Sequence, residues 1–224
     1  MNMLIGFCIL SISLLLIYIF TRNKDSLETS ILFTILNTIT FILSFKYTTI
    51  STFPVNTNSI TFVSMLSVLY IYYERNNIKE TRKLINQTFV INIGACLLLL
   101  LSSFYTQTID DTIGINMKNL FIDNYRILIT YPIVFLLSNY GMIYIYKKIK
   151  DIYDNMFIST SVSFLLIGLI ELIVFTLCSY LMKFDMRTIV RLILSTYMLR
   201  ILLTILYSFF LTFIIKKKKV KKWI

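Results

Sequence analysis

The 224-residue chain contains no histidine, the side chain that most often binds zinc or acts as a general base. Its absence excludes zinc-protease chemistry and catalysis by Ser-His-Asp or Cys-His arrangements. The three cysteines, Cys8, Cys96 and Cys178, each lie in an apolar stretch and form no CxxC pair. We therefore expect them to be small apolar residues, with neither a disulfide framework nor a metal site.

Glycine is also scarce, and the five glycines are scattered instead of being gathered into a phosphate-binding loop. The sequence has neither the paired aspartates of lipid phosphotransferases nor a rhomboid-type serine motif. Because these signatures are missing, we expect that the protein is not an enzyme and needs no cofactor.

Long apolar runs dominate what is present, since 57% of the residues are hydrophobic and only 15% are charged. Runs such as Leu14–Phe20 and Ala95–Leu101 are apolar on every face, which is typical of membrane helices and not of barrel strands. A helix of about 20 residues crosses the roughly 30 Å hydrocarbon core. We predict an all-α, polytopic membrane helical bundle with spans at residues 2–20, 30–49, 56–73, 88–105, 126–146, 157–181 and 189–215.

The basic residues indicate how these spans are oriented. With an external N-terminus, fifteen lysines and arginines lie on the cytoplasmic side, six lie on the other side, and Arg200 lies inside the last span. This bias predicts a multi-pass protein of the cell membrane with a cytoplasmic C-terminus. The first span is predicted as a helix and not as a secretory signal, because Met1–Leu4 carries no positive charge. Topology and lipid contact explain the net charge of +11 without a nucleic-acid partner.

Ionisable groups inside the spans are the strongest functional signal, because each costs about 2.5–3.5 kcal/mol at the bilayer centre. Glu171 lies near the middle of the sixth span, and Arg200 lies near the middle of the seventh. Consecutive spans are antiparallel, so we expect the two side chains to lie at one depth and to pair. Such a pair is either a neutralised structural couple or part of a wet central cavity that binds a polar solute.

Four further residues complete the predicted substrate-binding set. Asn92 and Asn139 lie within the fourth and fifth spans, where each can hydrogen-bond to another helix or contact a solute. Lys46 and Arg126 lie near the outer ends of their spans, where they can either extend to the headgroups or join the site.

The spacing of these residues resembles that of the queuosine-precursor transporters, also called the vitamin-uptake-transporter-like family, over roughly residues 31–219. In the sixth span, IELIVF resembles the family's Val-Asp-Ser helix, so Glu171 is the counterpart of its acid. In the seventh, TYMLR is similar to the family's Tyr-x-x-Lys helix, so Arg200 takes the place of its lysine. In the fifth, Ser138 and Asn139 stand where the family has a Ser-Gln pair.

The resemblance implies a six-helix transporter core at 30–215, after an additional N-terminal helix and cytoplasmic loop at 1–29 and before a basic cytoplasmic tail at 216–224. It implies import of a small solute, specifically a deazaguanine base, with a coupling ion or an energising subunit as a further partner. The open alternative is a non-transporting module, either a substrate-binding subunit of an energised importer or an assembly partner.

Several positions that are polar in that family differ here. They are Leu66 and Tyr70 for two acids of the third span, Met142 for an Asp of the fifth, Gly168 for a Gln of the sixth, and Thr204 and Ser208 for a Glu and a Pro of the seventh. A polar pocket discriminates through its paired donors and acceptors, so these changes should alter or abolish recognition of deazaguanines.

Overall fold

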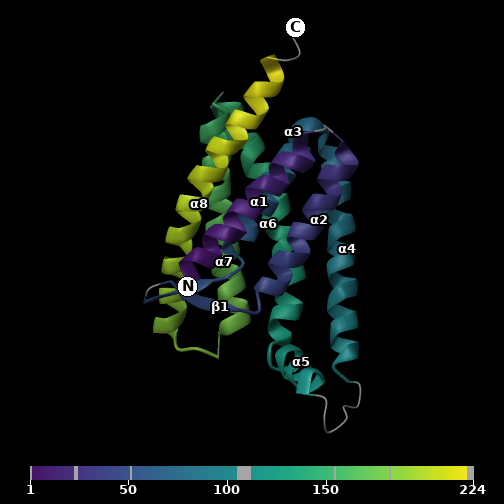
Figure 1. Ribbon diagram of the computed structural model, residues 1–224, viewed down its shortest axis with the longest axis vertical. Coiled ribbons are helices and arrows are strands. Elements are labelled where there is room, and N and C mark those ends of the chain that lie inside the picture. Colours follow the sequence, from purple (N-terminus) through teal and green to yellow (C-terminus); the bar gives the residue numbers. More distant parts are fainter. Residues whose placement is uncertain are drawn as a thin grey trace.

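The computed structural model describes residues 2–22, 25–50, 52–104, 112–153, 155–181 and 183–220. Over these residues the chain forms eight helices and one short antiparallel hairpin, which confirms the predicted helical membrane bundle (Figure 1). The elements are α1 (Asn2–Arg22), α2 (Ser26–Leu43), β1 (Tyr47–Ile50), β2 (Phe53–Asn56), α3 (Ser59–Arg75), α4 (Ile78–Ser102), α5 (Thr112–Asp123), α6 (Tyr125–Ile152), α7 (Met156–Tyr180) and α8 (Met186–Val220). Among the described helices, α1, α2, α4, α6, α7 and α8 are long and apolar enough to cross a membrane.

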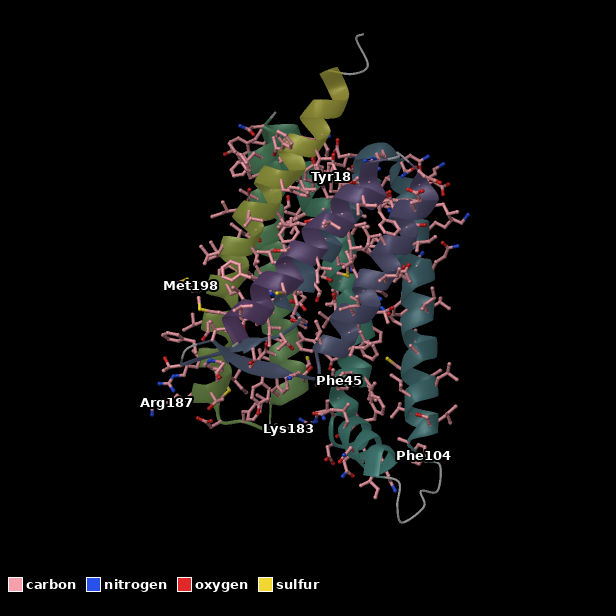
Figure 2. All side chains as sticks on the ribbon, viewed as in Figure 1. Tyr18, Phe45, Phe104, Lys183, Arg187 and Met198 are labelled. Atoms are coloured by element: carbon pink, nitrogen blue, oxygen red, sulfur yellow. The ribbon has the colours of Figure 1, made fainter. Side chains whose placement is uncertain are left out.

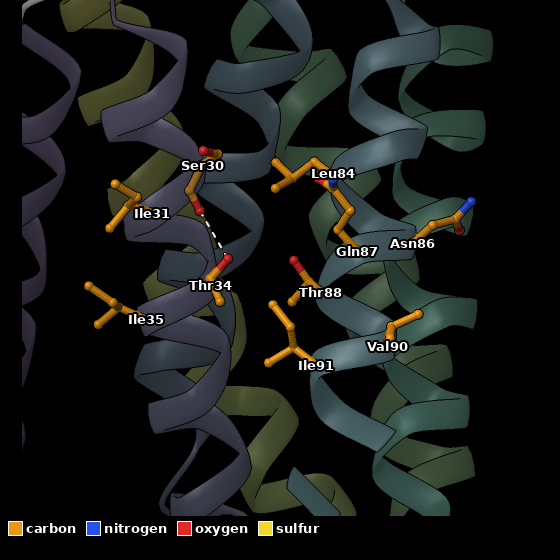
Figure 3. Close-up of a pocket in the computed structure, with 10 residues that line it drawn as sticks. All are labelled: Ser30, Ile31, Thr34, Ile35, Leu84, Asn86, Gln87, Thr88, Val90 and Ile91. Atoms are coloured by element: carbon orange, nitrogen blue, oxygen red, sulfur yellow. Dashed lines mark hydrogen bonds between the residues drawn. The ribbon is translucent and has the colours of Figure 1, made fainter. Parts of the chain in front are cut away.

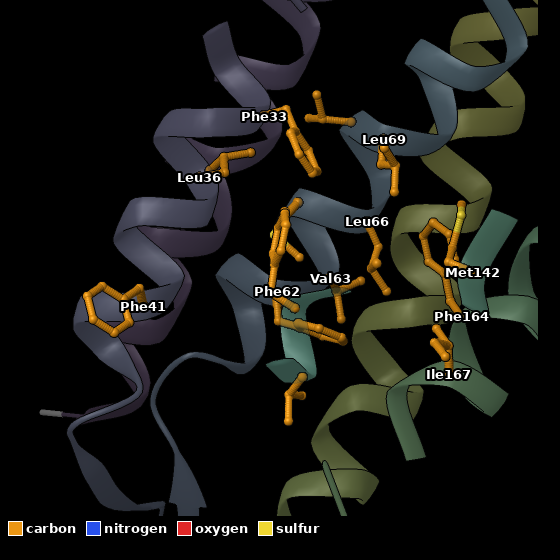
Figure 4. Close-up of a cluster of buried hydrophobic side chains, with 14 of the residues drawn as sticks. Phe33, Leu36, Phe41, Phe62, Val63, Leu66, Leu69, Met142, Phe164 and Ile167 are labelled. Carbon is orange, nitrogen blue, oxygen red and sulfur yellow. The ribbon is translucent and has the colours of Figure 1, made fainter. Parts of the chain in front are cut away.

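The remaining predicted span, residues 56–73, corresponds to α3, which is the central helix of the bundle. It packs against α1, α2, α4, α6, α7 and α8, and every residue from Thr61 to Tyr72 is buried. Figure 4 shows Phe62 and Leu66 of this helix within the apolar core. Its 17 residues rise about 25 Å, close to the shortest helix that crosses a bilayer.

The prediction that the second span continues to residue 49 is wrong. α2 ends at Leu43, and the hydroxyl of Ser44 donates to a carbonyl of the last turn at 2.6 Å. The next segment is rich in β-branched residues and contains Pro54, which cannot continue a helix. It forms the β1–β2 hairpin, in which Thr49 pairs with Pro54. We call this end of the bundle the hairpin end, and the opposite end, where α8 finishes, the tail end.

The fourth span also begins earlier than predicted, at Ile78 instead of residue 88. Asn77 caps the helix, because its side-chain oxygen accepts a hydrogen bond of 2.9 Å from the backbone N–H of Glu80. The first turns of α4 are polar, so hydropathy alone predicts a loop there. The capped helix nevertheless begins before the apolar stretch. The predicted loop between residues 105 and 126 contains α5, which was not predicted.

The outer surface of the bundle is strongly apolar. Large side chains such as Tyr18 of α1 and Met198 of α8 are exposed, and Figure 2 shows Met198 at the margin of the bundle. α1 crosses the outside of the bundle, packing on α2, α3 and β1, and its start lies at the hairpin end (Figure 1). An apolar belt of this kind suits contact with lipid. The division into an additional segment 1–29 and a core 30–215 stays a prediction.

Candidate solute-binding site

The α7–α8 pair positions the two charged residues of the interior. A short turn joins these antiparallel helices, and α8 begins after Asp185, whose carboxylate accepts a hydrogen bond of 2.5 Å from the hydroxyl of Thr188. That hydrogen bond lowers the pKa of the Asp185 carboxyl. Because the helices run in opposite directions from a short turn, their midpoints lie at one depth.

Glu171 and Arg200 meet at these midpoints as a buried ion pair. The Nη1 group of Arg200 donates to Oε2 of Glu171 and to the backbone carbonyl of Gly168, the latter at 2.9 Å. Only 2% of Arg200 and 5% of Glu171 is exposed. The ring of Phe62 from α3 covers one face of the guanidinium, 4.3 Å from Cζ to the ring centre. The structure therefore brings together the two residues that the sequence places at one depth.

The rest of the guanidinium has no partner in the described part of the protein. The Nε and Nη2 atoms of Arg200 are buried and make no hydrogen bond there. Gly168 lies beside them, and a Cβ atom built on this buried glycine would meet nothing within 4 Å. Open space and unused donors thus occur together next to the ion pair.

Asn139 of α6 lies at the same depth. Gly141 packs against Ile167, since a Cβ on the glycine would lie 2.6 Å from the Ile167 Cδ1 atom, and α6 and α7 are antiparallel. This pairing sets Asn139 level with Gly168 and the residues that follow it. The Nδ2 of Asn139 donates to the Phe135 carbonyl at 2.7 Å, whereas its buried Oδ1 has no partner among the described residues.

Asn58, at the start of α3, is a residue that the sequence analysis missed. Its amide is completely buried, and neither polar atom has a hydrogen-bond partner among the described residues. It precedes Phe62 by four residues, so the two side chains share a face of α3, and that face meets Arg200. In the sequence, Asn58 lies at the margin of an apolar run, where an interfacial loop residue is expected. Only its helical spacing from Phe62 could have indicated an inner position.

We call Asn58, Asn139, Glu171 and Arg200, with the space beside Gly168, the polar core. Buried polar groups in proteins are nearly always hydrogen-bonded to protein, water or ligand. Each unsatisfied group costs about 1–3 kcal/mol. The polar core is therefore arranged to accept water or a polar solute.

Asn92 lies in a different network. It exchanges hydrogen bonds with Asn37 of α2, and the shorter of the two is 2.6 Å. The hydroxyl of Tyr131 donates to Oδ1 of Asn37 at 2.9 Å, which joins α6 to the same network. Asn92 thus has partners for both polar atoms and links three helices. Tyr131 also lies within electrostatic range of Glu171.

Lys46 and Arg126 lie at the hairpin end, away from the ion pair. The guanidinium of Arg126 donates to the backbone carbonyl of Leu181, after the last turn of α7. Lys46 follows α2 and is exposed, and it lines a groove beside Asn56. The structure does not bring either residue into the polar core.

At the tail end, Glu74 joins α3 to α6. Its Oε1 accepts hydrogen bonds from the hydroxyl of Tyr146 at 2.9 Å and from Nζ of Lys150 at 2.6 Å. The Tyr146 and Tyr70 hydroxyls are 3.3 Å apart, with their rings edge to face. This tail-end cluster closes the interior between α3 and α6.

Among the surface grooves formed by described residues are three that neither Glu171 nor Arg200 lines. One of them, of about 730 Å³, separates α2 from α4, and its lining is uncharged. Figure 3 shows Thr34 and Thr88 pointing toward each other across it. For the expected inner cavity, the described residues show the space beside Gly168 and unpartnered atoms at Arg200 and Asn139.

These features define a polytopic helical membrane protein with a polar centre inside an apolar bundle. A family profile described as "vitamin uptake-like sensor" matches residues 46–215, about three quarters of the chain. The chain therefore belongs to the vitamin uptake-like sensor family. The matched range includes all four residues of the polar core and leaves α1 and α2 outside. No curated protein and no solved structure matches the chain.

The structure also places the positions that differ from the queuosine-precursor transporters. Leu66 and Met142 are completely buried, and Figure 4 shows both in the apolar cluster. Tyr70 is completely buried beside Tyr146, and Thr204 is 1% exposed on α8. These positions face the interior, so the substitutions change the chemistry of the core and not that of the lipid-facing surface.

Proposed function

We propose that the protein binds a small polar solute in the polar core and imports it across the cell membrane. The observation that carries this proposal is the set of buried, unpartnered atoms at Arg200 and Asn139, beside the open space at Gly168. An ion pair that served only as a brace would be expected to have its remaining donors satisfied within the protein. Membership of a vitamin uptake-like family supports the same conclusion.

The unpartnered atoms indicate the chemistry of the solute. The Nε and Nη2 edge of Arg200 offers parallel N–H donors, which match two neighbouring acceptor atoms. The free Oδ1 of Asn139 requires a donor. Glu171 already balances the charge of Arg200, so an uncharged solute leaves the interior neutral. A flat, uncharged heterocycle with carbonyl and N–H groups meets these conditions.

A queuosine precursor is the specific solute that we propose from the resemblance to its transporters. A deazaguanine is an uncharged ring whose carbonyl can accept from one of the two free N–H groups of Arg200, and whose N–H groups can donate to Oδ1 of Asn139. The buried apolar side chains of Leu66 and Met142 offer no hydrogen bonds, which favours a related heterocycle with fewer polar groups. A coupling ion or an energising subunit would supply the driving force.

Sensing without transport is the second candidate, because the family description names a sensor. Binding in the polar core would then change the helix packing, and no solute would cross. Both functions need the same binding event, and only import moves solute into a closed compartment.

Uptake and binding should be measured on the same protein. We expect cells that lack their own importer to accumulate radiolabelled deazaguanine when they produce this chain, and the purified protein to bind it. Arg200→Lys should abolish both accumulation and binding, because an ammonium group cannot replace the guanidinium fork. The matched control is Lys183→Met, since this exposed lysine bonds to Asn124, at 2.8 Å, far from the polar core. Binding without accumulation would assign sensing, and absence of both would reject this solute.

A further inference from the structure

A second polar site lies at the hairpin end, and neither Glu171, Arg200 nor Asn139 lines it. A groove of about 130 Å³ is enclosed by the first turns of α1, the hairpin, the start of α3, and α8. The residues that matter for its chemistry are Ile5, Gly6, Lys46, Asn56, Ser59 and Leu199. Its volume is about that of one small polar group with a few attached carbon atoms.

The polar side of the groove is positive. Lys46 is the one charged residue that lines it, and Lys46 forms no ion pair within the described residues. The start of α3 also lies here, and Asn58 makes no capping hydrogen bond to its first turn. Unsatisfied N–H groups give a helix N-terminus a partial positive charge that attracts anions.

Asn56 provides an independent sign of a missing ligand. It lines the groove, is only 1% exposed, and has no hydrogen-bond partner for either side-chain atom among the described residues. Its backbone is fixed by a hydrogen bond of 3.1 Å from its N–H to Oγ1 of Thr196. An amide held at this position can donate to an acceptor in the groove.

Most of the remaining lining is aliphatic, with Thr48, Thr57 and Ser59 as polar exceptions, and it reaches the lipid-facing surface. Ile5 of α1 lies in the groove and is 50% exposed, and neighbouring side chains of α1 are exposed as well. A ligand in this groove therefore contacts positive polar groups at one end and hydrocarbon at the other.

We propose that the groove binds an oxyanion, held by Lys46, Asn56 and the N-terminus of α3. The oxyanion is either the phosphodiester of an anionic lipid or a free ion such as inorganic phosphate. The aliphatic lining would hold the first carbon atoms of a lipid. Lys46 and Asn56 are not part of the polar core, so this proposal does not depend on solute binding at Glu171 and Arg200.

The test is thermal unfolding of the full chain, purified in a maltoside detergent, with three additions in separate titrations: phosphatidylglycerol, phosphatidylcholine and inorganic phosphate. Phosphatidylglycerol should raise Tm in a saturable manner, and phosphatidylcholine should not. Lys46→Met should weaken the phosphatidylglycerol effect roughly fivefold, as expected for one lysine near an anionic headgroup. Lys46→Glu should abolish it.

Gly6→Leu tests the space itself, because it fills the groove without changing a polar group. Gly94→Leu is the matched control in α4, where a Cβ meets nothing within 4 Å, and Lys183→Met controls for loss of a lysine at the same end. Both controls should respond as the wild type does. Stabilisation by phosphate alone would assign a free oxyanion. The proposal fails if neither anion stabilises the protein, or if Lys46→Met and Lys46→Glu respond like the wild type.

Discussion

At the scale of residues, Arg200 determines the chemistry of the interior. One of its nitrogen atoms pairs with Glu171 and with a backbone carbonyl, and the other two have no partner in the described structure. Taking two charges out of water is costly, and their mutual attraction repays only part of that cost. The pair is therefore expected to contribute little net stability, although each charge depends strongly on the other.

A double-mutant cycle measures this dependence. Glu171→Leu or Arg200→Leu alone should destabilise the protein by about 3–5 kcal/mol, because each leaves a lone buried charge. The combined variant should be much closer to the wild type. Denaturant unfolding in detergent gives the difference in the free energy of unfolding between the wild type and each of the three variants. A double variant as unstable as the sum of the single variants would show that the two charges do not interact.

At the scale of elements, the apolar runs predict every membrane helix, whereas several helix ends are missed. Hydropathy indicates where the part of a helix that lies in the hydrocarbon begins. Helices such as α4 extend past that point when a residue such as Asn77 caps them. The hairpin was missed because residues 47–50 are as apolar as a helix end, and only Pro54 and the β-branched residues signal strands. The pairing of Glu171 with Arg200 was predictable from the depth of the two residues in their spans alone. Asn58 was harder to predict, because it lies at the margin of an apolar run and only its helical spacing from Phe62 indicates an inner position.

The α6–α7 contact gives a prediction about helix packing. A Cβ at Gly141 would lie 2.6 Å from Cδ1 of Ile167, the far end of a flexible side chain. Gly141→Ala should therefore cost less than about 1 kcal/mol, while Gly141→Leu should cost about 1–3 kcal/mol by overpacking. Adding Ile167→Ala should recover part of the Leu variant's stability in thermal unfolding. If Gly141→Leu unfolds like the wild type, the two helices do not pack closely there.

The tail-end cluster predicts how the interior opens. Glu74→Gln should weaken the contact to Lys150 and Tyr146, and so loosen α3 from α6. We expect a cysteine placed at Ser161 to react faster with maleimide in this variant, measured after replacement of the three native cysteines. Lys148→Met is the control, because Lys148 stacks on Tyr144 and takes no part in the cluster. Equal rates in all three backgrounds would contradict a closing role for Glu74.

At the scale of the whole molecule, basic residues separate between the two ends. Lys46, Arg126 and Arg187 belong to the hairpin end, while Arg75, Lys150 and the end of α8 belong to the opposite one. The family match begins after α2, so the sequence places the polar core inside the family's shared region and α1 outside it. Membership of the family was predictable from the spacing of residues in the sequence. The solute was not predictable, because its recognition depends on which buried polar atoms lack partners, and only the structure shows those atoms.

The charge separation predicts the orientation in the membrane. A reporter fused after Ile224 should be cytoplasmic, and a tag placed before Met1 should be accessible from outside intact cells, because fifteen basic residues lie on the tail side and six on the other. Protease protection and reporter activity check the two ends separately. An N-terminal tag protected in intact cells would contradict this topology.

The most direct test of solute binding by the polar core is uptake by the combined variant Glu171→Leu with Arg200→Leu. This variant removes both charges without leaving either one unpaired, so it should keep a thermal unfolding temperature near that of the wild type. Uptake of radiolabelled deazaguanine by cells producing it should fall to the background of cells without the protein. Uptake at the wild-type rate by the folded variant would show that the pair is only a brace and that the solute binds elsewhere.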